Sequence, residues 1–148
     1  MFKNQYSSNI ISSACAGAVS IVQSKNNKDS TNSIKIQSST FDSCYGVHGG
    51  AIHLDDIENV EMSGGNIFRN NFATQSGGAI DFNCPDEKGY KPAWCSLKIS
   101  ESKFYSNRAT LNGGAINWNI FEPTMLLQSS DFQNNQAGIY GDKIAGIP

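Results

Sequence analysis

Apolar and polar residues alternate in short stretches along the chain, and the same short pattern returns at intervals. Three good copies of the tetrapeptide Gly-Gly-Ala-Ile carry it, each followed two residues later by Leu54, Phe82 or Trp118. The copies are Gly49, Gly50, Ala51 and Ile52; Gly77, Gly78, Ala79 and Ile80; and Gly113, Gly114, Ala115 and Ile116. A period of two residues is typical of β-strands, and no stretch keeps the 3.6-residue period of a helix. The pattern therefore predicts an all-β protein.

A second element, Phe-x-x-Asn, lies upstream of each Gly-Gly-Ala-Ile copy. Its phenylalanines are Phe41, Phe68, Phe104 and Phe132, and its asparagines are Asn71, Asn107 and Asn135, with Cys44 at the matching place in the first copy. The phenylalanines are spaced by 27, 36 and 28 residues. The long interval contains residues 84–95, which have a cysteine at each end, and removing eight of these residues restores the period of about 28.

Units of this length, with two or three short strands each, cannot form a stable core alone. Stacked units bury a continuous core, so the repeat predicts one parallel β-helix module over residues 1–148, with about five coils. The glycine pairs are expected at sharp corners with positive φ. The phenylalanines are expected to stack inside the tube, and the asparagines to form a ladder at a bend where each amide satisfies backbone groups.

The four cysteines lack the paired C-x-x-C spacing of a zinc site. We expect Cys84 and Cys95 to form a disulfide that closes the excursion at residues 84–95. Cys15 and Cys44 lie on successive coils and are the candidates for a second pair. An even number of cysteines in a chain rich in Ser and Asn favours an oxidising compartment.

The pairing of Gly-Gly-Ala-Ile with Phe-x-x-Asn resembles the repeats of the polymorphic outer membrane protein family and of large surface proteins of single-celled eukaryotes. The resemblance runs from about Ala16 to Ile144. It implies a right-handed, pectin-lyase-like parallel β-helix that is exposed at a cell surface, serves adhesion or wall building, and has no catalytic residues. The chain differs from the bacterial pattern because it has no translocating barrel segment. We expect it to be part of a longer protein.

Composition and charge narrow the function further. Charged residues make up 16% of the chain and the net charge is −2, so no basic face is available to hold nucleic acid by charge. No apolar run approaches the length of a spanning helix, and we expect no direct insertion into a membrane. The repeated motifs are structural, so we expect no cofactor and no bound metal.

Two places carry candidate contacts for a glycan or a protein. One is the outward column of the Gly-Gly-Ala-Ile strands, formed by Ser20, His53, Asp81 and Asn117, which we interpret as a solvated polar face. In that column, His53 and the neighbouring Asp81 are the residue types that serve as a general base and its orienting acid. The other place is the excursion at residues 84–95, where Tyr90 and Trp94 supply aromatic surface.

These observations favour a non-catalytic structural or adhesive module of an extracellular or cell-surface protein, with filament formation by end-to-end stacking. Its partners would be further copies of the chain or flanking coils of the parent protein, because open strand edges attract further strands. The alternative is a β-helix that binds or cleaves carbohydrate with its outer strand face, as a polysaccharide lyase or hydrolase does.

Overall fold

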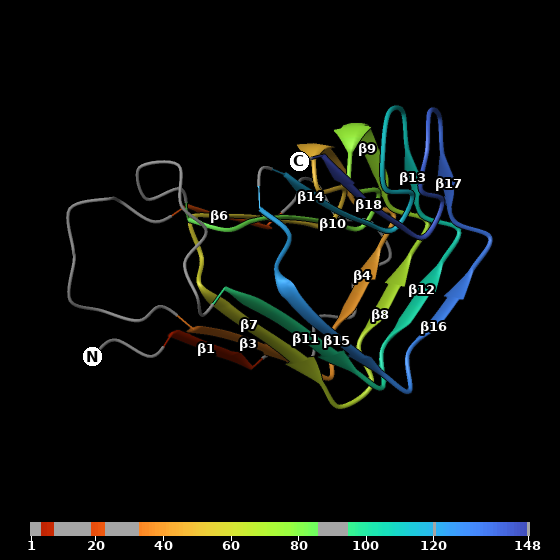
Figure 1. The fold of residues 1–148 in the computed structure, drawn as a ribbon. Coiled ribbons are helices and arrows are strands. Elements are labelled where there is room, and N and C mark those ends of the chain that lie inside the picture. Colours follow the sequence, from red (N-terminus) through yellow and green to blue (C-terminus); the bar gives the residue numbers. More distant parts are fainter. Residues whose placement is uncertain (1–3, 8–18, 23–32, 86–94, 120, 148) are drawn as a thin grey trace.

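The described part of the computed structural model comprises residues 4–7, 19–22, 33–85, 95–119 and 121–147. Within these ranges the chain forms strands and no helix, in two five-stranded and two four-stranded sheets (Figure 1). Sheet A contains β1 (Asn4–Ser7), β3 (Ser33–Gln37), β7 (Asn59–Ser63), β11 (Ser96–Ser100) and β15 (Thr124–Gln128). Sheet B contains β2 (Val19–Val22), β6 (Ile52–Asp55), β10 (Ile80–Asn83), β14 (Ile116–Asn119) and β18 (Ile144–Ile147).

The other two sheets consist of shorter strands. Sheet C contains β4 (Thr40–Asp42), β8 (Ile67–Arg69), β12 (Lys103–Tyr105) and β16 (Asp131–Gln133). Sheet D contains β5 (Tyr45–His48), β9 (Phe72–Ser76), β13 (Arg108–Ala109) and β17 (Gln136–Ala137).

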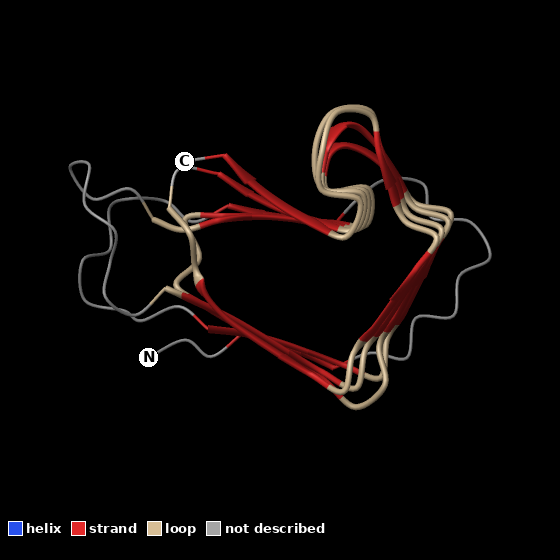
Figure 2. Ribbon diagram, turned by 45° about the vertical axis from the view of Figure 1, so that its right-hand side comes forward, coloured by secondary structure: helices blue, strands red, loops and turns tan. Residues whose placement is uncertain are grey.

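The chain passes through the sheets in the fixed order A, C, D, B and then returns to A one coil further along. Every strand pair is parallel, and the strands from β3 to β18 make four full coils, with β1 and β2 belonging to the coil before them. Figure 2 shows the coils superposed, with the strands of each sheet in layers. The predicted parallel β-helix of about five coils is confirmed.

Each of the four full coils in the described residues has four strands, so the prediction of two or three was wrong. The strands of sheets C and D span two to five residues, and several of them turn a single apolar side chain inward, such as Phe68 or Ala109. A strand with a single inward apolar residue shows no alternation of apolar and polar residues in the sequence, because alternation can be recognised only over about four or more residues.

Like residues lie on like residues in the core. In sheet A, Val60 pairs with Leu97 and Met62 with Ile99; in sheet B, Ile80 pairs with both Ile52 and Ile116. All of these side chains are buried. The apolar interior is therefore a set of columns that run along the axis, and each coil covers the core of its neighbours.

Phe41, Phe68, Phe104 and Phe132 form one of these columns. Successive ring centroids are 4.9, 4.8 and 4.6 Å apart, and the ring planes differ by 3–4°. Stacked aromatic pairs contribute about 0.5–1.5 kcal/mol beyond the burial of their area.

The asparagines form a buried ladder at the corner between sheets C and D. Asn71 Nδ2 donates to Asn107 Oδ1 at 2.8 Å, and Asn107 Nδ2 donates to Asn135 Oδ1 at 2.9 Å. The same amides donate to the carbonyls of Phe41, Phe68 and Phe104, and the first rung accepts from the backbone N–H of Cys44. The backbone N–H groups of Cys44, Asn71 and Asn107 lie between strands, and the ladder oxygens supply their hydrogen-bond partners.

A second buried amide, that of Asn66, lies at the corner between sheets A and C, where no repeated residue type marks the position. Asn66 Oδ1 accepts from the backbone N–H of Ser39, and its Nδ2 donates to the carbonyls of Ile36 and Ser63. In the next coil the smaller Ser102 takes the same corner. Because two residue types share this role, spacing alone could not reveal it.

The excursion leaves the β-helix after β10 and returns before β11. Cys84 and Cys95 are bonded as predicted, with their Cα atoms 5.8 Å apart. Both cysteines are buried. Tyr90 and Trp94 lie outside the described residues, as do Cys15 and therefore any Cys15–Cys44 pair.

Replacing Asn107 by Ala tests the ladder. The change removes the acceptor of the Asn71 N–H and one donor to Asn135 Oδ1 at a buried corner. We expect the free energy of unfolding to fall by about 3 kcal/mol, since each buried unsatisfied group costs about 1–3 kcal/mol. Urea denaturation measures this change in the free energy of unfolding. Gln136→Ala, which removes an exposed amide on β17, is the control and should change stability by less than about 0.5 kcal/mol. Equal effects of the two variants would contradict the role of the ladder.

Replacing both Cys84 and Cys95 by Ala tests the closed excursion. The loop spans 11 residues in sequence separation, so on the chain-entropy model we expect a loss of about 3 kcal/mol. Urea denaturation with and without reductant should move the wild type to the midpoint of the double variant. An unchanged wild-type midpoint in reductant would contradict this expectation.

Candidate functional site

The candidate site lies where the chain turns from sheet D into sheet B. We call these turns, residues 48–51, 76–79 and 112–115, the elbows. The first glycine of each pair has positive φ, at +66° for Gly49, +70° for Gly77 and +64° for Gly113. The second glycine does not, so only the first glycine of each pair uses the positive φ that was predicted for these corners. A Cβ on Gly78 would overlap the carbonyl oxygen of Gly114, so this position requires glycine because two elbows approach each other closely.

The elbows fold directly onto the outer face of sheet B. A Cβ on Gly113 would lie 2.8 Å from the Cβ of Asn117, and one on Gly77 would lie 2.9 Å from the backbone nitrogen of Asp81. Side chains that point outward from the strand are covered there. Asp81 and Asn117 are 0% exposed. The prediction that these two residues belong to a solvated face was therefore wrong, because glycine allows the preceding turn to cover them.

The outer column consists of Ser20, His53, Asp81 and Asn117, which are aligned in register on β2, β6, β10 and β14. Its exposure changes along the axis: Ser20 is exposed, the side chain of His53 is 21% exposed, and the last two are buried. The column therefore connects solvent at one end to a buried carboxylate.

Hydrogen bonds link the buried part of the column. His53 Nδ1 lies 3.1 Å from Asp81 Oδ2, and Asn117 Nδ2 donates to Asp81 Oδ1 at 2.7 Å. Asn83, two residues beyond Asp81 on β10, donates from Nδ2 to Asp81 Oδ2 at 3.5 Å. Both carboxylate oxygens of Asp81 are thus occupied, and the carboxylate is held in one orientation.

The carboxylate of Asp81 also controls the charge of His53. The hydrogen bond from Asp81 raises the pKa of His53; burial opposes this, and the negative charges of Asp81 and Asp55 add to the rise. A charged imidazolium is consequently favoured next to the buried carboxylate.

Two polar side chains on the elbows, His48 and Asn112, were not among the candidate residues predicted from the sequence. Three buried atoms here have no hydrogen-bond partner among the described residues: His48 Nδ1, Asn112 Oδ1 and Asn117 Oδ1. The rings of His48 and His53 are 5.9 Å apart between centroids. A signal was present, because a polar residue precedes each glycine pair: His48, Ser76 and Asn112.

The described residues also bear on two other features, a metal site and a membrane-spanning helix. Within these ranges no three His, Cys, Asp or Glu side chains are grouped closely enough to hold a metal ion. No helix in the described ranges is long and apolar enough to cross a membrane.

Compared with models of known protein families, with characterised proteins and with solved structures, the chain finds no match. Its function must therefore be argued from its own geometry. Two features carry that argument: the outer column and the surface at the last coil.

The charge of His53 gives a pH-dependent stability. Its pKa is raised in the folded state, so its stabilising contribution is complete below the unfolded pKa of about 6.5. The contribution is lost as the pH rises through the folded pKa. We expect the difference in free energy of unfolding between wild type and His53→Gln to be larger at about pH 5.5 than at about pH 8.5, measured by urea denaturation.

The Asp81→Asn background is the control for this measurement, because it removes the carboxylate and keeps the shape. There the effect of His53→Gln should be the same at both pH values. A pH dependence that persists without the carboxylate would show that another group is responsible.

Proposed function

We propose that the chain is a structural module of an extracellular or cell-surface protein, a rigid β-helix that lengthens when a second copy stacks on its last coil. The observation that carries this proposal is the surface of that coil, formed by β15, β16, β17 and β18. We call it the terminal face. Its apolar columns end without a cover among the described residues.

The inner columns of sheet A show this most clearly. Leu127 is 39% exposed, although Ile99, its partner in the same column, is 1% exposed. Met125 and Phe132 are also only partly buried, and each continues a column whose previous member is fully buried. Apolar side chains that would be core in a longer solenoid therefore meet solvent, which is unfavourable by about 25 cal/mol per Å².

The backbone of the terminal face is open as well. β15, β16, β17 and β18 are each the outermost strand of their sheet. An outermost strand presents unpaired N–H and C=O groups that pair with any strand of matching register. Four such edges in one plane make a template for a whole coil, which favours stacking over sideways association.

At the terminal face, sheet B is less open to solvent than sheet A. A Cβ on Gly146 would overlap the ring of Trp118, so the indole occupies the interior at the level of the last coil. The half-buried Trp118 thus lies against the last strand of sheet B, and Ile144 of that strand packs against the core, while Leu127 in sheet A is exposed. A stacking partner would bury Met125, Leu127 and Phe132 in particular.

Two further observations support an extracellular setting. The Cys84–Cys95 disulfide is typical of oxidising compartments. The repeat resemblance described above points to surface proteins that serve adhesion. The rigid columns of a β-helix suit a stalk, because each coil contacts only its neighbours and length can be added freely.

Carbohydrate cleavage or binding by the outer face of sheet B is the second candidate, and the His53–Asp81 hydrogen bond favours it. Glycoside cleavage ordinarily uses two carboxyl groups that flank the bond. Asp81 is fully buried with both oxygens occupied, so it cannot take such a position. The half-buried Asp55, Asn83 and Asn119 could bind sugar hydroxyls, which leaves binding as the stronger form of this candidate.

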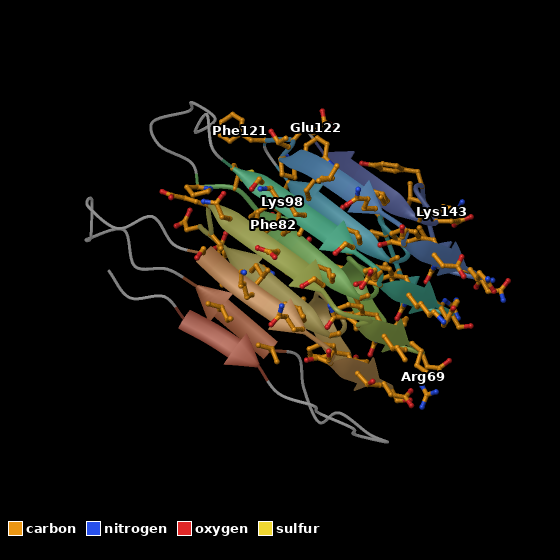
Figure 3. All side chains as sticks on the ribbon, turned by 90° about the horizontal axis from the view of Figure 1, so that it is seen from below. Arg69, Phe82, Lys98, Phe121, Glu122 and Lys143 are labelled. Carbon is orange, nitrogen blue, oxygen red and sulfur yellow. A yellow bond between two sulfur atoms is a disulfide. The ribbon has the colours of Figure 1, made fainter. Side chains whose placement is uncertain are left out.

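A matched pair of variants tests stacking. Leu126 and Leu127 are neighbours on β15, but Leu127 continues the inner column of Ile99 while Leu126 continues the outer column of Lys98 (Figure 3 labels Lys98 on sheet A). Leu127→Glu would place a charge inside a stacked interface, which costs several kcal/mol. We expect it to abolish self-association, measured by light scattering and negative-stain electron microscopy.

Leu126→Glu is the control, because it adds the same charge to the same strand on the lateral face. It should assemble like the wild type. Thermal melting must show that both variants are folded. A wild type that stays monomeric at high concentration, or two variants that assemble equally, would overturn the proposal.

A further inference from the structure

We propose that Ser20, His53 and Asp81 act together as a nucleophile, a general base and an orienting acid, and that the chain transfers acyl groups from small esters to Ser20. This activity goes beyond the structural role and does not depend on it. The three residue types and their order in space are those that activate a serine hydroxyl.

The parallel register brings the three residues together. Ser20 is paired with His53, and His53 is paired with Asp81, on the adjacent strands β2, β6 and β10. Adjacent strands lie about 4.8 Å apart, and residues in register project from the same face. His53 therefore stands between a hydroxyl on one side and a carboxylate on the other.

The hydrogen bond to Asp81 sets the chemistry of His53. Nδ1 bonds the carboxylate of Asp81, so in the neutral imidazole Nδ1 carries the proton and Nε2 has the free lone pair. Nε2 is not the ring nitrogen that bonds Asp81, and the side chain of His53 is 21% exposed, so Nε2 is the nitrogen left for a hydroxyl or a substrate. A base with this tautomer can accept the proton of the Ser20 hydroxyl once a substrate draws the two groups together.

Asp81 is built to orient and not to react. It is fully buried and its oxygens accept from His53, Asn117 and Asn83, so it cannot reach a substrate. Its charge stabilises the imidazolium that forms when His53 takes a proton. Asp81 and Asn117 are thus positioning residues, while Ser20 and His53 would contact the substrate.

Access matches these roles. Ser20 is exposed, and β2 is the outermost strand of sheet B in the described part of the chain. Two carboxylates, those of Asp81 and Asp55, act on His53 by their charge, and Asn83 donates to Asp81 beside it. The substrate that fits is a neutral ester of a small acid, because the carboxylates of Asp55 and Asp81 repel anions and Val19, the residue before Ser20, offers only a small exposed apolar side chain.

The reaction balances with water as the only co-reactant. Ser20 Oγ forms a bond to the acyl carbon, and its proton passes to His53 Nε2. The ester C–O bond then breaks, and the leaving alkoxide takes that proton and departs as an alcohol. In the second half, water attacks the acyl carbon with His53 as base, the acyl–Oγ bond breaks, and Ser20 recovers a proton while a carboxylic acid is released.

A fluorophosphonate probe, which bonds covalently to activated serines, tests the proposal on the full chain. We expect one adduct by intact-protein mass spectrometry, mapped to Ser20 by peptide analysis. Ser20→Ala should lose it, and His53→Gln should slow labelling about 100-fold, the lower range of general-base contributions. Ser63→Ala removes a partly exposed serine of sheet A and should label like the wild type.

The pH profile of wild-type labelling needs no variant and so remains decisive if His53→Gln does not fold. Labelling should rise as His53 loses its proton, at a pH above the usual imidazole range because Asp81 and Asp55 raise the pKa of His53. His48 faces the same ring and is tested by His48→Gln, which should leave the profile in place. No adduct, an adduct on another serine, or a flat profile would overturn the proposal.

Discussion

In-register parallel pairing between successive coils is the constraint on which the rest of the structure depends. It places Phe on Phe, Asn on Asn and Ile on Ile, so a residue choice at one position is repeated every coil. The excursion at residues 84–95 does not disturb it: Ile80 still pairs with Ile116, and Leu97 still pairs with Val60. A disulfide at the base of the excursion keeps both ends at one corner, which is why the insertion costs no register.

The same constraint gives polar residues a place in the interior. A buried amide is costly alone, but in a column each amide donates to the next coil and to a backbone carbonyl of the previous one. Asn71, Asn107 and Asn135 are therefore stable only as a set. Interactions of this kind lie between coils, so the stability of a coil depends on its neighbours and decreases towards the ends of the solenoid.

The sequence predicts those structural features in which the same residue type recurs at the same place in every coil. The Gly-Gly-Ala-Ile and Phe-x-x-Asn spacings give the number of coils and the inner columns, because like residues recur at like places. Sheet D escapes detection because a strand such as Arg108–Ala109 is too short to alternate. The burial of Asp81 escapes it as well: alternation shows that the side chain points outward, but not that the elbow at Gly77 folds over it. The burial of Asp81 depends on a tertiary contact with this elbow, which the spacing of residues along the chain does not reveal.

The contrast between two sets of buried amides bears on where function resides. The corner ladder leaves no polar atom without a partner, so this fold can satisfy buried amides fully. Beside the elbows, in comparable burial, Asn112 Oδ1, Asn117 Oδ1 and His48 Nδ1 have no partner among the described residues. Among the described residues, three of the four buried side-chain atoms without a partner lie near the hydrogen-bonded His53–Asp81 pair, and the fourth is Glu58 Oε2 at the turn before β7. Buried polar atoms without hydrogen-bond partners are concentrated at functional sites in proteins, because a residue there is selected for its chemistry and not for stability. We propose the terminal face as the place where such a module extends, and the region of the elbows is where it departs from a purely structural repeat.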